Sequence, residues 1–354
     1  MNRLNKIFLG LLALFAIVFT AGSSCFSQDA YLLKKQATAS GFTVILLPDT
    51  QYYTKHYPQI YLEQTRWIAD NRDRLNIKFV IHLGDITQDD TTPQWQVADK
   101  AHQILDQAGI PYSVIPGNHD MPSDGLGRKR DTALFNRYFG PQRFAEKTWY
   151  GGHLGSGNEN NYSFFDGDGL KFMVVGLEFA PTLAALAWAN DIIRQFKDHR
   201  VIIVTHCYLA KSPAGATGAG GYQKNCAERY HLDGSGGDTV WKKLVRRHRK
   251  IFMVLSGHVH DVEHKERIGL AGNPIHEILT DYQSEHPGGD IEKPKNGNGW
   301  LRILQFFPGE NRIDVRPHSV IGEKRFYLIS RYDPNPQHSD HAFSFKYRMT
   351  NPAP

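Results

Sequence analysis

The sequence has few long apolar runs, little net charge and few cysteines. Its one long apolar run, Ile7 to Ala21, covers about 15 residues, which is short for a membrane span, and no later run is long enough. The formal charge of +5 falls to +3 when Arg3 and Lys6 are removed with that run, so we expect no nucleic-acid binding. Internal repeats, low-complexity tracts and a clear linker are absent, which favours one domain.

The N-terminal residues predict export. Arg3 and Lys6 precede the apolar run, and small residues follow it, which is the three-part layout of a secretory signal peptide. We therefore predict a signal peptide over residues 1–27 and a single domain with a C-terminal strand extension over residues 28–354, located in the periplasm or outside the cell. A lipoprotein anchored through Cys25 is the alternative, but Gly22 stands where such signals usually have leucine.

Apolar periodicity predicts alternating strands and helices. The helical spacings lie in Tyr57–Leu75, Pro93–Ala108, Thr132–Phe139, Thr182–Lys197 and Thr239–His248. A hairpin is expected from Tyr162–Phe165 and Leu170–Glu178, and later strands from Ile275–Tyr282, Trp300–Phe307, Arg312–Arg316 and Ala342–Tyr347. This strand content is too high for a simple doubly wound fold, so we expect two sheets with outer helices.

Five apolar runs each end in a side chain that can bind a metal. The runs with their ends are Val44–Pro48 before Asp49-Thr50-Gln51, Phe79–Leu83 before Gly84-Asp85, Ile110–Val114 before Ile115-Pro116-Gly117-Asn118-His119-Asp120, Val201–Thr205 before His206, and Phe252–Ser256 before Gly257-His258-Val259-His260. Open α/β sheets place their chemistry at the carboxyl ends of strands. We therefore expect these side chains to converge on one metal site.

The donors at these ends suit divalent cations. Asp49, Asp85, Asn118, His206, His258 and His260 offer mixed oxygen and nitrogen ligands, which Mn, Fe and Zn accept. They are enough for two ions if one carboxylate bridges. The two histidines flank Val259, and we expect each to serve a different ion.

The same set resembles the calcineurin-like metallophosphoesterase superfamily. The order Asp-x-His, Gly-Asp, Gly-Asn-His-Asp/Glu, His and Gly-His-x-His is kept from about Thr43 to His260, with Gln51 in place of the first histidine. The resemblance implies an α/β fold, a four-layer α/β/β/α sandwich of two mixed sheets flanked by helices. Asp281-Tyr282-Gln283 and Gly297–Arg302 are similar to segments of bacterial exported members.

The resemblance also implies a role for each matching residue. Asp49 and His260 would hold a first ion, Asn118, His206 and His258 a second, and Asp85 would bridge them, with a hydroxide between the ions as nucleophile. His119 would face the substrate, and Asp120 would hydrogen-bond its imidazole. Gln51 offers a carbonyl oxygen instead of an imidazole, which shifts the first site towards Mn or Mg and leaves its contact with metal open.

Two classes of function remain after these observations. The first is an exported phosphomonoesterase or phosphodiesterase acting on a phosphorylated small molecule, a lipid head group or a glycan. The alternative is a catalytically weakened phosphoesterase scaffold that binds a glycan or protein at the surface through Tyr208–Gly237. The sequence leaves the oligomeric state and the native metal open.

Three further sites carry smaller expectations. Cys207 and Cys226 allow one disulfide, which export favours, while a thiolate role for Cys207 at the metal is the alternative. His82 is expected to be a satisfied core histidine. Gly127–Asp131 is expected to be a solvated basic loop, with contact to an anionic substrate as the alternative.

Overall fold

The computed structural model describes residues 41–123, 127–211, 221–283, 297–321 and 340–349. The predicted signal peptide over residues 1–27, Cys25 and the predicted start of the mature chain at residue 28 lie outside these ranges. None of the helices in the described ranges combines the length and the apolar character that a membrane crossing needs.

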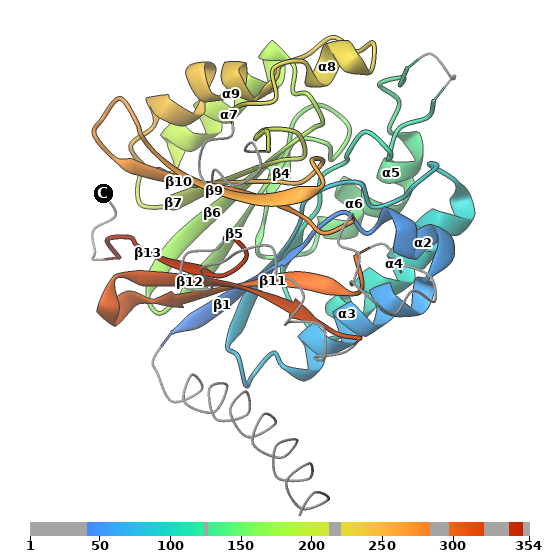
Figure 1. Ribbon diagram of the computed structural model, residues 1–354, viewed down its shortest axis with the longest axis horizontal. Helices are drawn as coiled ribbons and strands as arrows, with labels where there is room; N and C mark the ends of the chain where they lie inside the picture. The colour runs from blue at the N-terminus through green and yellow to red at the C-terminus, as the bar shows by residue number, and fades with distance from the viewer. Residues whose placement is uncertain (1–40, 124–126, 212–220, 284–296, 322–339, 350–354) are drawn as a thin grey trace, which may run out of the picture. The chain divides into compact units, whose positions relative to one another are not determined.

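Within these ranges the strands form two mixed sheets (Figure 1). The first sheet has the order β13-β12-β11-β1-β2-β3, and the second has the order β4-β5-β6-β7-β8-β10-β9. The strands are β1 (Phe42–Leu47), β2 (Ile77–His82), β3 (Tyr112–Ser113), β4 (Tyr150–His153), β5 (Asn161–Gly167), β6 (Leu170–Leu177), β7 (Arg200–Thr205), β8 (Ile251–Ser256), β9 (Asp261–Ile268), β10 (Pro274–Asp281), β11 (Trp300–Phe307), β12 (Arg312–Ser319) and β13 (Phe343–Lys346).

The inner faces of the two sheets share one apolar core. Phe42 on β1 packs 4.6 Å from Phe306 on β11 and 5.4 Å from Phe172 on β6, measured between ring centroids. Side chains alternate along a strand, so Phe172 and Val174 of β6 enter this inner core. Met173 and Val175 point the other way and join a second core. Each central strand is therefore buried on both faces, as its unbroken apolar sequence predicts.

Helices cover the outer faces. On the second sheet, α7 (Leu183–Gln195) and α9 (Gly237–Lys243) supply Leu186, Ile193 and Val240 to the outer core. On the first sheet lie α3 (Pro58–Asp70) and α4 (Thr92–Gln107), where Tyr61 and His102 share a 2.9 Å hydrogen bond. The remaining helices are α2 (Gln51–His56), α5 (Ala133–Phe139), α6 (Pro141–Phe144), α8 (Cys226–Arg229) and the 3-10 turns η1 (Val245–Arg247) and η2 (Pro308–Glu310). The predicted four-layer α/β/β/α sandwich is confirmed.

The predicted elements are present with shifted ends. The helix predicted over Tyr57–Leu75 ends at Asp70, and the one predicted over Thr239–His248 breaks at Leu244 into a 3-10 turn. Strand β9 was not predicted. Its sequence is polar, and it becomes a strand because every residue pairs with apolar β10 in antiparallel register.

Parallel pairing brings the carboxyl ends of the motif strands to one edge of each sheet. In the first sheet β1 pairs with β2 and β2 with β3 in parallel. In the second sheet β7, β8 and β10 are parallel neighbours in that order. The loops that follow these strands therefore lie at the same end of the sandwich, where the five motifs meet.

Candidate metal centre

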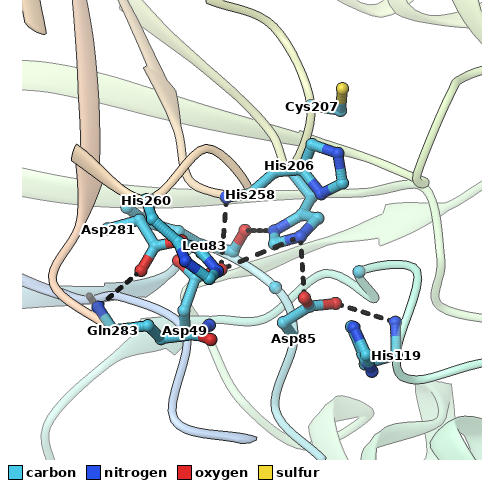
Figure 2. A network of polar contacts seen from close by, with 12 residues as sticks. Asp49, Leu83, Asp85, His119, His206, Cys207, His258, His260, Asp281 and Gln283 are labelled. Carbon is cyan, nitrogen blue, oxygen red and sulfur yellow. Dashed lines mark hydrogen bonds and ion pairs between the residues drawn. The ribbon is translucent and has the colours of Figure 1, made fainter. Parts of the chain in front are cut away.

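Two carboxylates and two imidazoles form the middle of the site (Figure 2). The Oδ2 atom of Asp85 lies 3.2 Å from Nε2 of His206, and Oδ1 of Asp49 lies 3.8 Å from the same nitrogen. One ligand atom each from Asp85, His206 and His258 lie within 4.8 Å of one another. These side chains follow β1, β2, β7 and β8, so the convergence expected from the strand ends is present.

The backbone around these side chains adopts uncommon conformations. Asp49, Asp85 and His258 have positive φ angles of 40°, 51° and 74°. Residues with a Cβ take such angles rarely, and they gather at functional sites where the surrounding fold holds them. A Cβ at Gly117 would lie 2.1 Å from Oδ1 of Asp85, and one at Gly257 would lie 2.3 Å from Oδ2 of Asp49. These motif glycines let the backbone approach the carboxylates closely.

Hydrogen bonds fix the orientation of the central groups. Nδ1 of His206 lies 2.8 Å from the carbonyl oxygen of Leu83. A carbonyl only accepts, so Nδ1 carries the proton and Nε2 faces the carboxylates. Burial lowers the pKa of His206, but Asp85 raises it to a net value above the ordinary one. A proton and a cation therefore compete for Nε2.

Several buried polar atoms at the predicted ligands accept no hydrogen bond from the described residues. They are Oδ2 of Asp49, Oε1 of Gln51 and Oδ1 of Asn118. Leaving a polar atom buried and unpaired costs about 1–3 kcal/mol, and a bound cation would remove that cost. Carboxylate, amide oxygen and imidazole donors also suit Mn, Fe, Zn and similar ions, so these residues fit a divalent metal site.

The pKa shifts of the buried ionisable groups also favour a bound cation. Burial raises the pKa of Asp49 well above its ordinary value, and Asp281 and Asp85 raise it further. Burial also acts to raise the pKa of Asp85, but His206 and His119 hold it below its ordinary range. The ion pairs of Asp49 and Asp85 within the described ranges are with His206 alone. Burial lowers the pKa of His258 to about 3, which keeps its imidazole neutral and able to bind a cation.

Comparisons with known proteins agree with this geometry. The profile of the family "Calcineurin-like phosphoesterase" matches residues 42–262. This chain belongs to the calcineurin-like phosphoesterase family. The family consists of metal-dependent phosphoester hydrolases, so the predicted resemblance is confirmed, and divalent metal ions are implied.

Two individual proteins are similar to this chain in sequence. The uncharacterized protein YvnB of Bacillus subtilis is 33% identical over 300 residues, which are 82% of this chain and 21% of that protein. This chain thus spans about a fifth of that relative. A probable glycerophosphodiester phosphodiesterase, GpdQ of Arcobacter nitrofigilis, is 22% identical over 227 residues, covering 61% of this chain and 70% of that protein.

Two solved structures cover most of the chain at low identity. Purple acid phosphatase PPD1 from yellow lupin seeds has a TM-score of 0.48 at 14% identity and covers 88% of this chain and 55% of its own. GAP50, the anchor in the inner membrane complex of Plasmodium, has a TM-score of 0.43 at 10% identity, with 88% and 90% covered.

The expected hydrogen bond between Asp120 and the His119 imidazole is wrong. Oδ2 of Asp120 accepts from the backbone N–H groups of Ile86 and Gly117, at 2.9 and 2.8 Å. Its Oδ1 accepts from the N–H and the hydroxyl of Thr87, at 2.7 and 3.0 Å. Burial and Asp85 raise the pKa of Asp120 to about 7, against these donors. Asp120 therefore ties together the two loops that carry Asp85 and His119.

His119 is oriented by groups other than Asp120. Its Nδ1 lies 2.8 Å from the carbonyl oxygen of Gln88, which accepts when this nitrogen is protonated. Its backbone N–H donates to Oδ1 of Asp85 at 2.8 Å. Nη2 of Arg128 lies 3.1 Å from the same Nδ1, and Nη1 of Arg128 donates to the carbonyl of Met121.

The expectation of a solvated loop at Gly127–Asp131 is therefore wrong for its arginines. Arg128 lies against His119, and Arg130 forms a 2.7 Å ion pair with Glu178 at the end of β6. The motifs gave no signal for these contacts, because neither arginine belongs to a motif and Arg130 is 48 residues from Glu178 along the chain. The only signal in the sequence for these contacts was the basic character of the loop.

His260 and Asp281 occupy one side of the site. The side chain of His260 is 48% exposed, and its Nε2 lies 3.9 Å from Oδ2 of Asp281, whose side chain is fully buried. Asp281 ends β10, and its segment was noted only as similar to exported relatives. The signal that could have identified it is the pattern of the other ligands, a carboxylate that follows an apolar strand.

Two smaller expectations are confirmed. Cys207 and Cys226 form a disulfide, which excludes a thiolate role for Cys207 at a metal. His82 is buried in the core, where it shares a 2.9 Å hydrogen bond with the hydroxyl of Thr50 and accepts from the N–H of Gly84 at 3.1 Å. The disulfide directly follows His206 and links the loop after β7 to α8.

Proposed function

We propose that the protein is an exported phosphoesterase that works with two divalent cations. The observation that carries the proposal is a set of buried oxygen atoms beside the Asp85–His206 pair. These oxygens, on Asp49, Gln51 and Asn118, accept no hydrogen bond from the residues that the structure describes. A site without a cation would leave each of these atoms unsatisfied in the core.

The ligands divide into two sets around Asp85. Asp49, Gln51 and His260 would hold one cation, Asn118, His206 and His258 would hold the other, and Asp85 would contact both. Asp85 lies 3.2 Å from His206 of the second set, and Asp49 of the first set lies 3.8 Å from the same imidazole. When bound, a pair of divalent cations binds the phosphoryl group, activates water and stabilises the charge of an in-line displacement.

His119 would act on the leaving group. The Gln88 carbonyl and Arg128 both contact Nδ1, so Nε2 is the ring atom that can carry a proton to the leaving oxygen. Arg128 beside this ring would attract the anionic phosphoryl oxygens, since guanidinium forks match phosphate geometry. Asp120 would act only by positioning the loops that carry Asp85 and His119.

The proposed substrate is a phosphorylated small molecule, a lipid head group or a glycan outside the cytoplasm. Similarity to a probable glycerophosphodiester phosphodiesterase supports including a phosphodiester among the test substrates. Mn is the cation we expect to work best, because the amide oxygen of Gln51 replaces an imidazole and favours harder ions.

The test measures hydrolysis of an aryl phosphomonoester and an aryl phosphodiester by the metal-stripped chain after addition of Mn, Fe, Zn or Mg. We expect metal-dependent turnover that falls by about 100-fold or more in His119→Ala, with metal content unchanged. His56→Ala is the matched control, because His56 is an exposed histidine at the end of α2.

Each outcome has a clear meaning. Metal-dependent turnover that survives in His119→Ala would refute the role of His119. Absence of turnover together with less than one bound ion per chain would refute the phosphoesterase proposal and leave the surface binding scaffold. Export is tested separately, by locating the full-length chain in cell fractions and sequencing its mature N-terminus.

A further inference from the structure

Asp281 is a fully buried carboxylate outside the five motifs. It is the last residue of β10, and its Oδ1 accepts the backbone N–H of Gln283 at 2.8 Å. Its Oδ2 accepts no hydrogen bond from the described residues. One oxygen is thus fixed by the backbone, and the other is left for a partner that the described residues do not supply.

The surroundings of Asp281 place it at the first cation of the proposed pair. Its Oδ2 lies 3.9 Å from Nε2 of His260, and Figure 2 shows the two side chains together, on the side of the site away from His119. Strand β10 runs parallel to β8 with Leu279 opposite Ser256, so Asp281 comes level with the loop that carries His258. Figure 2 also shows Asp281 on the same side of the site as Asp49.

Arg302 of β11, on the other sheet, bonds to other groups near the end of β10. Nη1 of Arg302 donates to the carbonyl of Leu279 and to the hydroxyl of Thr280, at 3.3 and 2.9 Å. Within the described ranges the ion pair of Asp281 is the one with His260, at 3.9 Å. Among the residues that the structure describes, Asp49 and Asp281 are therefore two buried carboxylates with no ion pair to Lys or Arg, an arrangement that is costly unless a cation joins them.

We propose that Asp281 binds, through Oδ2, the same cation as Asp49 and His260, and that its charge compensates for Gln51. This inference rests on the proposed function. Gln51 supplies a neutral oxygen where the motif has an imidazole, so the first site loses a strong donor. A second carboxylate restores both a donor and a negative charge, and it makes the site rich in oxygen, as harder ions such as Mn prefer.

The test counts bound ions rather than turnover. Metal-stripped protein is titrated with Mn by calorimetry, and the ions retained after desalting are counted by mass spectrometry. The variants are Asp281→Asn, Gln51→His and the double variant. Glu277→Gln is the matched control, because Glu277 is a buried carboxylate on the same strand that binds Tyr208 and Arg267 instead.

We expect two ions in the unaltered chain and in Glu277→Gln. Asp281→Asn should keep one ion and bind the other at least about 10-fold more weakly. The double variant should regain the second ion, because an imidazole at position 51 replaces the lost donor. Two ions with unchanged affinity in Asp281→Asn, or no recovery in the double variant, would overturn the inference while leaving the proposed function intact.

Two further results distinguish a failure of this inference from a failure of the proposed function. Fewer than two ions in the unaltered chain would overturn the dinuclear proposal and this inference together. If Asp281→Asn does not fold, the anomalous signal of Mn in crystals of the unaltered chain decides. A peak about 2.0–2.6 Å from Oδ2 of Asp281 supports direct binding, and a peak beyond that range overturns it.

Discussion

Replacement of Asp120 by asparagine separates a structural from a catalytic role for this carboxylate. The side chain receives donors on both oxygens, from Ile86 and Gly117 on Oδ2 and from Thr87 on Oδ1. An asparagine amide has one oxygen and one NH₂ group. Its nitrogen must therefore face donors on one side of the carboxylate position.

The expected loss in the free energy of unfolding follows from the hydrogen bonds that Asp120→Asn removes. With the nitrogen at the Oδ2 position, two buried N–H groups lose their acceptor, at about 1–3 kcal/mol each. With the nitrogen at the Oδ1 position, the Thr87 hydroxyl can turn to accept, so only the Thr87 N–H is left unpaired. The second orientation costs less, so we expect the free energy of unfolding to fall by about 1–3 kcal/mol in Asp120→Asn.

The assay is equilibrium urea unfolding of the metal-free protein, followed by tryptophan fluorescence. His119→Ala is the comparison and should lose less than about 1 kcal/mol, because its ring is partly exposed and bonds through a single nitrogen, to Gln88 and Arg128. An Asp120→Asn protein with unchanged unfolding free energy but strongly reduced turnover would refute this reasoning. It would restore Asp120 as the residue that orients His119.

Two further predictions concern a glycine and a titrating carboxylate. Gly117→Ala should weaken Mn binding by about 10-fold or more in calorimetry, because the new Cβ displaces Asp85, whereas Gly309→Ala, with open space around it, should bind as before. Burial raises the pKa of Asp90 to about 6, above its unfolded value. Ionisation of Asp90 therefore destabilises the fold above that pH, and this destabilisation disappears as the pH falls towards 4. Asp90→Asn should therefore raise the urea midpoint at pH 7.5 but not at pH 4, since the amide oxygen still accepts from the Trp95 indole. Asp89→Asn should instead lower the urea midpoint at pH 7.5. Burial acts to raise the pKa of Asp89, but Gln94 and Lys55 lower it below its ordinary value, so the ionised carboxylate stabilises the fold. A midpoint that moves the same way at pH 7.5 in both variants would contradict this assignment.

The candidate metal ligands could be predicted because the information is local. Each one follows an apolar strand within a few residues, and parallel pairing brings such ends to one edge of a sheet. The central strands were predictable for the same reason, since burial on both faces leaves an unbroken apolar run in the sequence. Strand β9 has no such run, because it takes its conformation from pairing with β10.

The errors concern contacts between distant segments. Asp120 follows His119 directly, which suggested a bond between them, but the fold presents it with the N–H groups of Ile86 and Thr87. Arg128 looked like part of a solvated loop, and the fold places it against His119. Neither contact has a local pattern, because a carboxylate or guanidinium pairs with whatever group the tertiary structure places beside it.

The sequence alone determined the kinds of ligand, their order and the sheets that carry them, because strand periodicity and motif spacing are properties of short segments. The tertiary structure alone decided which oxygen atoms are already bound by the backbone and which are left without a donor. That distinction separates Asp120, with both oxygens satisfied, from Asp49 and Asp281, each with one oxygen unpaired. It depends on the positions of N–H groups from other strands and loops, which no stretch of sequence specifies by itself.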